Sequence, residues 1–305
     1  SYQKAPAYDD ALCNYAHVSV KLRDYNHAFK ELLKRKEKGY NPKINEALAR
    51  IYFFEGDIDK EVDLFKENEK NNHLNPVTAS HLLVSMNYSS NFDQKDYLNY
   101  CKKIDRKFSF SDTEIKELNK LKLDKELRVG FISPDFKEHS VYYFLKTILN
   151  SLKNRKIKIF AFNLRKRNEL DEKSYELQGE FDEWIDVSDS TDFVAANKII
   201  DKKISILIDI TGHFARNRFR ILKYKPSPIQ ISWMGFVNTT GIKEIDFLIA
   251  DHNLIKKDEE NFYSEKILRL PNIWNCHSGF TENLKINEAP LVKNNFLTFG
   301  CFNNS

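Results

Sequence analysis

The second part of the chain alternates short apolar runs with amphipathic helical segments, and this alternation restricts the fold more than any other feature. Residues 206–208 (I-L-I) are apolar at every position, as in strands that are buried on both faces. Strands that alternate with helices form right-handed crossovers and a mostly parallel sheet. The sequence therefore predicts a Rossmann-like α/β lobe over residues 127–295.

The strands of this lobe can be placed by their length and apolar character. They are predicted at residues 127–132, 157–162, 183–187, 204–210, 229–234, 245–250 and 266–270. Helices are predicted between them at residues 141–152, 171–178, 193–201 and 215–222. Ligands of such sheets bind beyond the carboxyl ends of the strands. We therefore expect the chemistry in the polar loops after the first, fourth and fifth strands.

The first 75 residues carry a helical repeat. Ala16 and Leu32 recur 33 residues later as Ala49 and Phe65, a period close to the ~34 residues of tetratricopeptide repeats. The spacing predicts TPR-like helical hairpins over residues 1–75, with a small residue where two helices approach closely. Stacked hairpins can form a groove for a protein segment or merely cap the neighbouring domain, and the sequence leaves both open. Residues 76–126 are predicted as a helical connector.

Charge and cysteine content exclude several classes of protein. The chain has 305 residues, and its 48 basic and 44 acidic side chains give a net charge of +4. These charges lie in mixed runs, so we expect no nucleic-acid partner. The four cysteines are far apart in the sequence, which argues against a zinc site or a disulfide scaffold and fits a cytoplasmic protein. No apolar run approaches the ~20 residues that span a bilayer, so no membrane partner is expected.

Three well-known site motifs are missing from the sequence. No GxGxxG follows the first predicted strand, and neither GxxxxGK[ST] nor GxSxG occurs. These absences argue against NAD- or FAD-dependent enzymes, P-loop nucleotidases and α/β-hydrolases. We therefore expect no cofactor, and any nucleotide must be held in another way.

The three polar loops supply the candidate site residues. They are Asp135, His139, Asp209, Thr211, Gly212, His213, Asn238, Thr239, Thr240 and Gly241. His139 is the candidate catalytic residue, because an imidazole with an ordinary pKa near ~6.5 suits proton handling at neutral pH. The alternative for His139 is a loop histidine that caps the helix beginning at Val141.

The other candidates have competing interpretations. His213 is assigned equally to cleft lining and to simple packing. A carboxylate at a strand end, such as Asp209, commonly anchors neighbouring backbone amides. Residues 238–241 (N-T-T-G) offer hydroxyls and amides to a ligand, but the same residues also suit an ordinary glycine-terminated turn.

The motifs at these strand ends resemble those of a known family. Residues 128–139 read R-V-G-F-I-S-P-D-F-K-E-H, residues 206–213 read I-L-I-D-I-T-G-H, and residues 226–235 read P-S-P-I-Q-I-S-W-M-G. N-T-T-G at 238–241, Y-S-E-K at 263–266 and R-L-P at 269–271 follow. In order and spacing, across about 145 residues, these motifs resemble the O-GlcNAc transferase and Spindly family of glycosyltransferases.

The resemblance implies an architecture. That family joins tetratricopeptide repeats to two facing Rossmann-like lobes, the GT-B arrangement, and residues 127–295 would be the first lobe. Residues 298–304 (T-F-G-C-F-N-N) resemble the start of the second, donor-binding lobe, which residues 296–305 would only begin. Since the chain also starts without Met, we expect a truncated fragment that is inactive alone.

The resemblance also implies an activity. It implies that a sugar passes from a nucleotide diphosphate to Ser or Thr of a protein with inversion, without a metal. UDP-GlcNAc is favoured as the donor over the GDP-fucose of Spindly-type members, and acceptor proteins would contact the repeats and the cleft. His139 would be the family's active-site histidine, as a base or as a positioning group. A non-catalytic scaffold of repeats and one lobe is the remaining alternative.

Two departures from the family's pattern affect the expected cleft. The residues Val141, Tyr142 and Tyr143 replace small residues that commonly follow the histidine, and Phe236 and Val237 replace a common Tyr-Pro. Bulky side chains at both places would reshape the cleft. The identity of acceptor and donor is therefore left open at this point.

Overall fold

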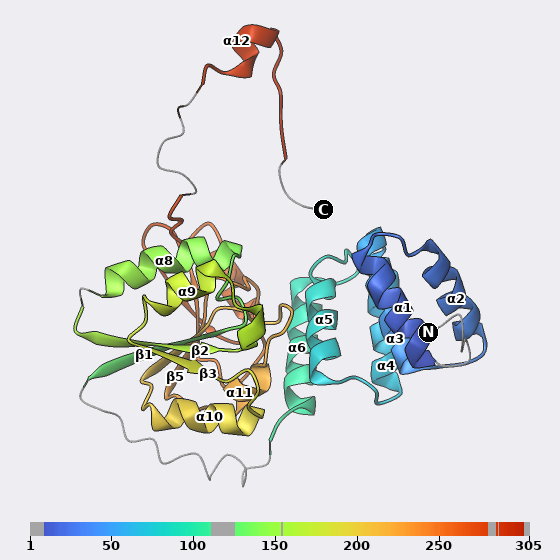
Figure 1. Cartoon of the computed structure of the whole chain (residues 1–305), viewed down its shortest axis with the longest axis horizontal. Coiled ribbons are helices and arrows are strands. Elements are labelled where there is room, and N and C mark those ends of the chain that lie inside the picture. Colours follow the sequence, from blue (N-terminus) through green and yellow to red (C-terminus); the bar gives the residue numbers. More distant parts are fainter. Residues whose placement is uncertain (1–8, 111–125, 154, 280–284, 286, 302–305) are drawn as a thin grey trace.

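A computed structural model describes residues 9–110, 126–153, 155–279, 285 and 287–301. It contains a helical part followed by an α/β lobe (Figure 1). The end of the predicted connector and residues 302–304 of the final motif lie outside the described residues.

Helical hairpins build the N-terminal part. Its helices are α1 (Asp9–Lys21), α2 (Asn26–Glu37), α3 (Pro42–Glu55), α4 (Ile58–Lys70), α5 (Pro76–Met86) and α6 (Gln94–Lys107). Asn41 caps α3 by accepting hydrogen bonds from the amides of its first turn, and Gly56 ends the helix with a left-handed backbone. The repeated residues Ala16, Leu32, Ala49 and Phe65 are buried in one hydrophobic cluster. The hairpins that the repeat predicts are therefore present.

A parallel sheet forms the centre of the lobe. Its strands are β1 (Leu127–Ser133), β2 (Ile157–Asn163), β3 (Glu183–Asp186), β4 (Ile206–Asp209), β5 (Ile229–Ser232), β6 (Phe247–Ala250) and β7 (Lys266–Arg269). All neighbouring strands are parallel, in the order β3-β2-β1-β4-β5-β6-β7. Every strand that the sequence predicts is found. The chain moves outward from β1 in one direction and then from β4 in the other, so the topological switch point lies between these two strands.

Helices cover both faces of the sheet. Helices α8 (Ser140–Leu152) and α9 (Glu172–Gln178) lie on one face, and α10 (Asp192–Asp201) and α11 (Phe219–Lys223) lie on the other (Figure 1). Two short 3₁₀ helices, η2 (Arg167–Glu169) and η3 (Lys257–Phe262), lie in connections. The prediction of a helix over residues 215–222 was wrong at its start. Arg216 has a left-handed backbone with φ of 63°, so the segment turns there and the helix begins at Phe219.

The predicted connector packs directly on the lobe. Phe236 of the lobe belongs to the hydrophobic cluster of α1–α6, and the Tyr97 hydroxyl of α6 donates to the Thr239 carbonyl. We call this contact region the junction: it joins α5 and α6 to the loop after β4, to α11 and to the segment between β5 and β6. No helix in the described part of the chain is long and apolar enough to cross a membrane.

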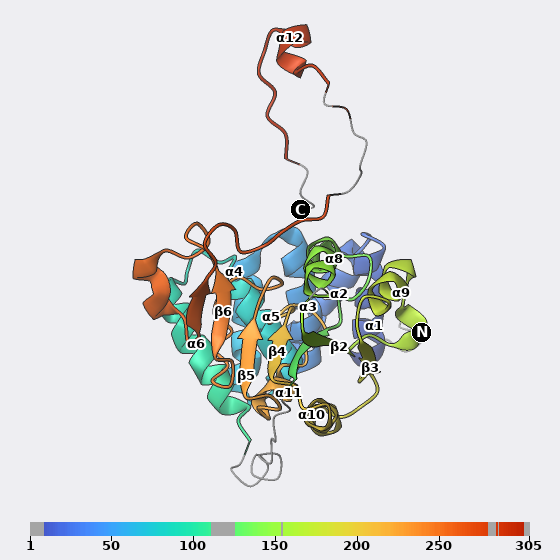
Figure 2. The same ribbon diagram turned by 90° about the vertical axis from the view of Figure 1, so that its left-hand side faces the viewer.

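The chain after β7 crosses the carboxyl edge of the sheet (Figure 2). The Trp233 indole donates to the Trp274 carbonyl, and the Ser278 amide donates to the Tyr143 carbonyl of α8. Helix α12 (Pro290–Asn294) follows and stands away from the lobe. This path places residues 272–279 above the strand ends where the candidate site lies.

Candidate active site

A hollow of about 400 Å³ lies at the carboxyl ends of β1, β4 and β5. The arrowheads of the neighbouring parallel strands β4 and β5 point to this edge of the sheet (Figure 2). Asp135 and His139 reach the hollow from the loop after β1, Thr211 from the loop after β4, and Gly235 from the loop after β5. The hollow adjoins the switch point, where parallel sheets hold their ligands. The three loops that the sequence singled out therefore meet at one place.

The hollow has a polar side and an apolar side. Asp135, His139, Ser140 and Thr211 contribute polar groups. The remaining wall consists of Val141, Phe144, Ile210, Phe214, Ala215, Met234 and Gly235. A small molecule or a peptide side chain that combines apolar area with a few hydrogen-bonding groups fits such a lining.

His139 caps the helix that begins beside the hollow. Its backbone is extended, and its Nδ1 accepts a hydrogen bond from the Val141 amide at 3.3 Å. A backbone N–H can only donate, so Nδ1 carries no proton and Nε2 carries it in the neutral ring. Nε2 makes no hydrogen bond to the described residues. The capping role considered for His139 is therefore present, and it leaves the second nitrogen available as a donor.

Asp135 lies among cationic side chains. Burial raises the pKa of its carboxyl above the ordinary value, although the charges of Arg165, Lys137 and Arg216, and of His139 when its ring is protonated, oppose this rise. Arg165 is buried and donates from Nε to the Pro134 carbonyl at 2.9 Å. The Asp135 carboxylate is therefore more basic than a carboxylate in water. The cationic side chains around it still favour its ionised form.

The loop after β4 is fixed by Asp209. Its carboxylate accepts from the amides of Thr211, at 3.2 Å, and Gly212, at 2.9 Å. Burial raises the pKa of Asp209 to about 6. The Thr211 hydroxyl is 2.9 Å from that of Ser133, whose oxygen also accepts from the Asp135 amide. Asp209 thus anchors backbone amides as expected, and Ser133 joins the loops after β1 and β4.

His213 lies in the junction and does not line the hollow. Its side chain is 1% exposed, its Nε2 lies 2.7 Å from the Thr240 carbonyl, and its Nδ1 lies 3.1 Å from the Ser80 hydroxyl of α5. Of the two interpretations of His213, its position supports packing. Gly212 also belongs to the junction, because with φ of +59° a Cβ there would come within 2.2 Å of Phe236.

The N-T-T-G segment also lies away from the hollow. The Asn238 amide donates to the Asn87 side chain at the end of α5, and Thr239 and Thr240 are bonded to the buried carboxylate of Glu265. Gly241 has φ of +68°, and a Cβ there would come within 2.2 Å of Cys101 on α6. Their expected place in the cleft is not supported, because contacts with α6 and Glu265 bury all four residues.

Several contributors to the site were not found from the sequence. Phe144 and Met234 form its apolar wall, Arg165 braces the loop after β1, and Ser80 touches the neighbouring loop from α5. Phe144 lies four residues after Ser140, so a helix that starts at Ser140 places both on the face that lines the hollow. Nothing in the sequence signals Ser80, because its contact depends on how α5 docks.

The lining offers complementary groups for group transfer. His139 supplies a donor at Nε2, Asp135 supplies a carboxylate, and Thr211 supplies a hydroxyl. Within the described residues, no three His, Cys, Asp or Glu side chains are grouped so that they could hold a metal ion. The arrangement suits a reaction in which one group hydrogen-bonds a reactant and another accepts a proton.

Known proteins are similar in sequence to part of this chain. SPINDLY of Petunia hybrida, named a "Probable UDP-N-acetylglucosamine--peptide N-acetylglucosaminyltransferase", is 31% identical over 186 residues, which are 59% of this chain and 20% of that protein. SEC of Arabidopsis thaliana, with the same enzyme name, is 30% identical over 188 residues, 59% of this chain and 19% of that protein. The enzyme named "UDP-N-acetylglucosamine--peptide N-acetylglucosaminyltransferase" of Caenorhabditis elegans is 28% identical over 148 residues, 48% of this chain and 13% of that protein.

A solved structure shows the same architecture. An O-GlcNAc transferase mutant of Thermobaculum terrenum superposes with a TM-score of 0.78 at 20% identity, covering 90% of this chain and 53% of that one. The chain thus spans about half of this solved protein and about a fifth of the curated relatives. The family model described as "Glycosyl transferase family 41" matches residues 55–283. From the strand-end loops, the fold and this match, we conclude that the chain belongs to glycosyl transferase family 41.

Proposed function

We propose that the complete protein transfers a sugar from a nucleotide diphosphate to the hydroxyl of a Ser or Thr side chain in an acceptor protein. UDP-GlcNAc is the proposed donor. The observation that carries the proposal is the hollow at the ends of β1, β4 and β5, with His139 and Asp135 in its lining. Support for the donor comes from the names of the relatives, which are peptide N-acetylglucosaminyltransferases that use UDP-N-acetylglucosamine.

The reaction requires a proton acceptor and a donor of hydrogen bonds. The acceptor oxygen attacks the anomeric carbon, the bond from that carbon to the diphosphate breaks, and the diphosphate leaves with the electron pair. In-line attack inverts the anomeric centre. In the tautomer that the cap requires, His139 donates from Nε2, so we assign to it the role of orienting a reactant. We assign acceptance of the hydroxyl proton to Asp135, because burial raises the pKa of this carboxyl.

Negative charge develops on the leaving diphosphate. Arg165, Lys137 and Arg216 place positive charge around Asp135, and helix α8 points its amino end toward the hollow through Ser140 and Val141. Basic side chains and helix amino ends stabilise anionic oxygens. The proposed reaction therefore proceeds without a metal ion.

The helical part is proposed to hold the acceptor protein. A groove of about 480 Å³ runs between α1 and α3 and carries both acidic and basic side chains, among them Asp10, Lys43, Glu46 and Arg50. A peptide segment of mixed charge suits such a lining. In this proposal the segment lies along the helices and presents its hydroxyl to the hollow.

Transfer can be measured directly. The complete gene product is incubated with radiolabelled UDP-GlcNAc or GDP-fucose and with peptides that contain Ser and Thr, and the matched peptides with Ala at those positions are the control. We expect label from UDP-GlcNAc on the hydroxyl peptides alone. Transfer only from GDP-fucose would replace the proposed donor, and a folded protein that transfers neither sugar would disprove the proposed activity.

A further inference from the structure

We propose that Ser80 and His213 are positioning residues that couple helix α5 to the loop lining the hollow. Through them the helical part shapes the candidate site, and the proposal rests on the proposed function only in treating that hollow as the active site. Ser80 belongs to α5 and His213 to the loop after β4, 133 residues later.

The His213 ring joins three segments through two hydrogen bonds. A carbonyl only accepts, so the 2.7 Å contact with the Thr240 oxygen places the proton on Nε2. Nδ1 is then the acceptor for the Ser80 hydroxyl at 3.1 Å. The neutral imidazole thus connects α5, the loop after β4 and the segment between β5 and β6. Burial lowers the pKa of His213 to about 4, which keeps the ring neutral and both bonds in place near neutral pH.

The residues next to His213 form part of the hollow. Thr211, Phe214 and Ala215 all line it. The Asn217 amide donates to the carbonyls of His213, at 3.1 Å, and Phe214, at 2.8 Å, which closes the loop on itself. A shift of the His213 ring therefore moves atoms that surround the candidate site.

The direction of the Ser80 hydroxyl distinguishes it from another buried serine of the same helix. A serine inside a helix commonly donates to a carbonyl one turn earlier, and Ser85 does so to His81 at 2.9 Å. Ser80 is fully buried, and its hydroxyl instead faces His213 and Asn217 of the lobe. The Ser80 hydroxyl therefore contacts the lobe and does not bond to the backbone of its own helix.

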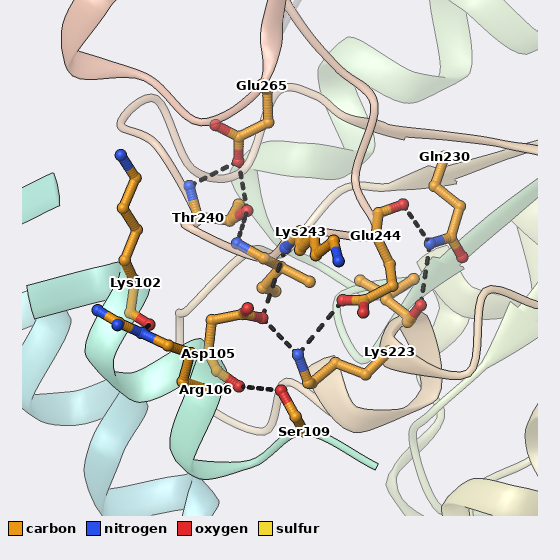
Figure 3. A network of polar contacts seen from close by, with 12 residues as sticks. Lys102, Asp105, Arg106, Ser109, Lys223, Gln230, Thr240, Lys243, Glu244 and Glu265 are labelled. Atoms are coloured by element: carbon orange, nitrogen blue, oxygen red, sulfur yellow. Dashed lines mark hydrogen bonds and ion pairs between the residues drawn. The ribbon is translucent and has the colours of Figure 1, made fainter. Parts of the chain in front are cut away.

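The far side of the His213 ring is held firmly. Thr240 is bonded to Glu265, and Lys223 of α11 joins Asp105 of α6 to Glu244 (Figure 3). Phe219 and Phe236 pack edge-on against the imidazole, with centroids 5.9 and 5.5 Å away. With these contacts in place, a displacement of α5 passes to the loop that carries His213.

Hydrogen exchange of the loop tests this coupling without any activity assay. The amides of Phe214 and Asn217 donate within the loop, so their exchange reports its opening. In Ser80→Ala we expect exchange of residues 209–218 to accelerate about fivefold, the effect of losing one neutral hydrogen bond. Ser85→Ala is the matched control, since it is equally buried on the same helix, and it should leave that segment unchanged. Equal exchange of the segment in both variants would overturn the proposal.

A second pair of variants separates hydrogen bonding from packing. His213→Gln keeps a donor and an acceptor, whereas His213→Phe fills the aromatic site without either. We expect the loop to exchange more slowly in the glutamine variant than in the phenylalanine variant, and the reverse order would contradict the proposal. In the complete enzyme, Ser80→Ala should lower kcat severalfold at unchanged KM for the nucleotide sugar. If the unaltered protein transfers no sugar, the proposed function fails, while the exchange comparison still decides the roles of Ser80 and His213.

Discussion

Nδ1 of His139 caps helix α8, and Nε2 has the proposed role in the reaction, so the two can be tested separately. Nδ1 accepts from the Val141 amide at the start of α8. Nε2 is left as a donor beside the hollow. For Nε2 to act as a base, the proton would have to move to Nδ1 and the cap would be lost. The observed geometry thus favours a positioning role for the histidine over a role as the base.

Replacing His139 by asparagine should remove the hydrogen-bond donor at Nε2 and keep the cap of helix α8. An asparagine oxygen is a good helix cap and can accept from Val141, but no group remains at the place of Nε2. We expect His139→Asn to retain the thermal stability of the unaltered protein while sugar transfer falls about 10²-fold or more. His139→Ala should lower transfer equally and stability by about 1 kcal/mol. Thermal unfolding and initial rates on the complete protein check both, and full activity in the asparagine variant would exclude the proposed role of Nε2.

Some of the candidate residues line the hollow and others lie elsewhere, for a physical reason. Asp135, His139 and Thr211 follow strand ends directly, and parallel strands bring such residues to one edge. Asn238 and Gly241 also follow a strand, but their environment is set by α6, which lies about 140 residues earlier. No local sequence pattern encodes a contact over that distance. The sequence therefore could not show whether the N-T-T-G segment binds a ligand or is buried against α6.

Within single elements, a buried carboxylate in α4 is the least expected feature. Glu61 is only 4% exposed although its side chain is a carboxylate. Its Oε2 finds no hydrogen-bond partner in the described structure. Burial raises the pKa of Glu61 to about 7, and the Ser85 hydroxyl opposes this only in part. The carboxylate therefore destabilises the helical part when it is ionised.

The effect of Glu61 on stability should depend on pH. The folded state binds this proton up to about pH 7, and the unfolded state releases it near the ordinary glutamate pKa of 4.5. The contribution of Glu61 to stability is therefore fully present below about pH 4.5 and is lost as pH rises to about 7, by at most about 3 kcal/mol. Glu61→Gln should remove this slope in urea unfolding, whereas the exposed control Glu37→Gln should keep it. Parallel pH profiles for the unaltered chain and the Glu61 variant would refute the assignment.

The elements themselves were largely predictable. The central strands β1, β2 and β5 were located from apolar runs that are mostly buried, whereas the edge strands β3 and β7 are only partly buried. The start of α11 was misplaced because the left-handed backbone at Arg216 belongs to a residue type that does not signal such a turn. The docking of α5 and α6 was not foreseen either, since their amphipathic pattern predicts a buried face without naming its partner.

At the scale of the whole molecule, buried charge holds the helical part against the lobe. Lys223 of α11 is 1% exposed and pairs with Asp105 of α6 and with Glu244, which follows the N-T-T-G segment. Taking charges out of water is unfavourable unless every partner is present. Because the groups come from both parts of the chain, the network stabilises one docking geometry and should make the two parts unfold together.

Removing the single cation of this network should uncouple the two parts. Lys223→Met leaves Asp105 and Glu244 without their lysine, and we expect it to lower the free energy of unfolding by about 3–5 kcal/mol. All three tryptophans lie in the lobe, so their fluorescence reports the lobe, while far-UV circular dichroism also reports the helices. The two urea transitions should coincide in the unaltered chain and separate in the variant.

Lys34→Met, which breaks the exposed pair with Glu31, is the matched control and should lower the free energy of unfolding by less than about 1 kcal/mol. A loss in Lys223→Met no larger than this would show that the pair does not hold the junction.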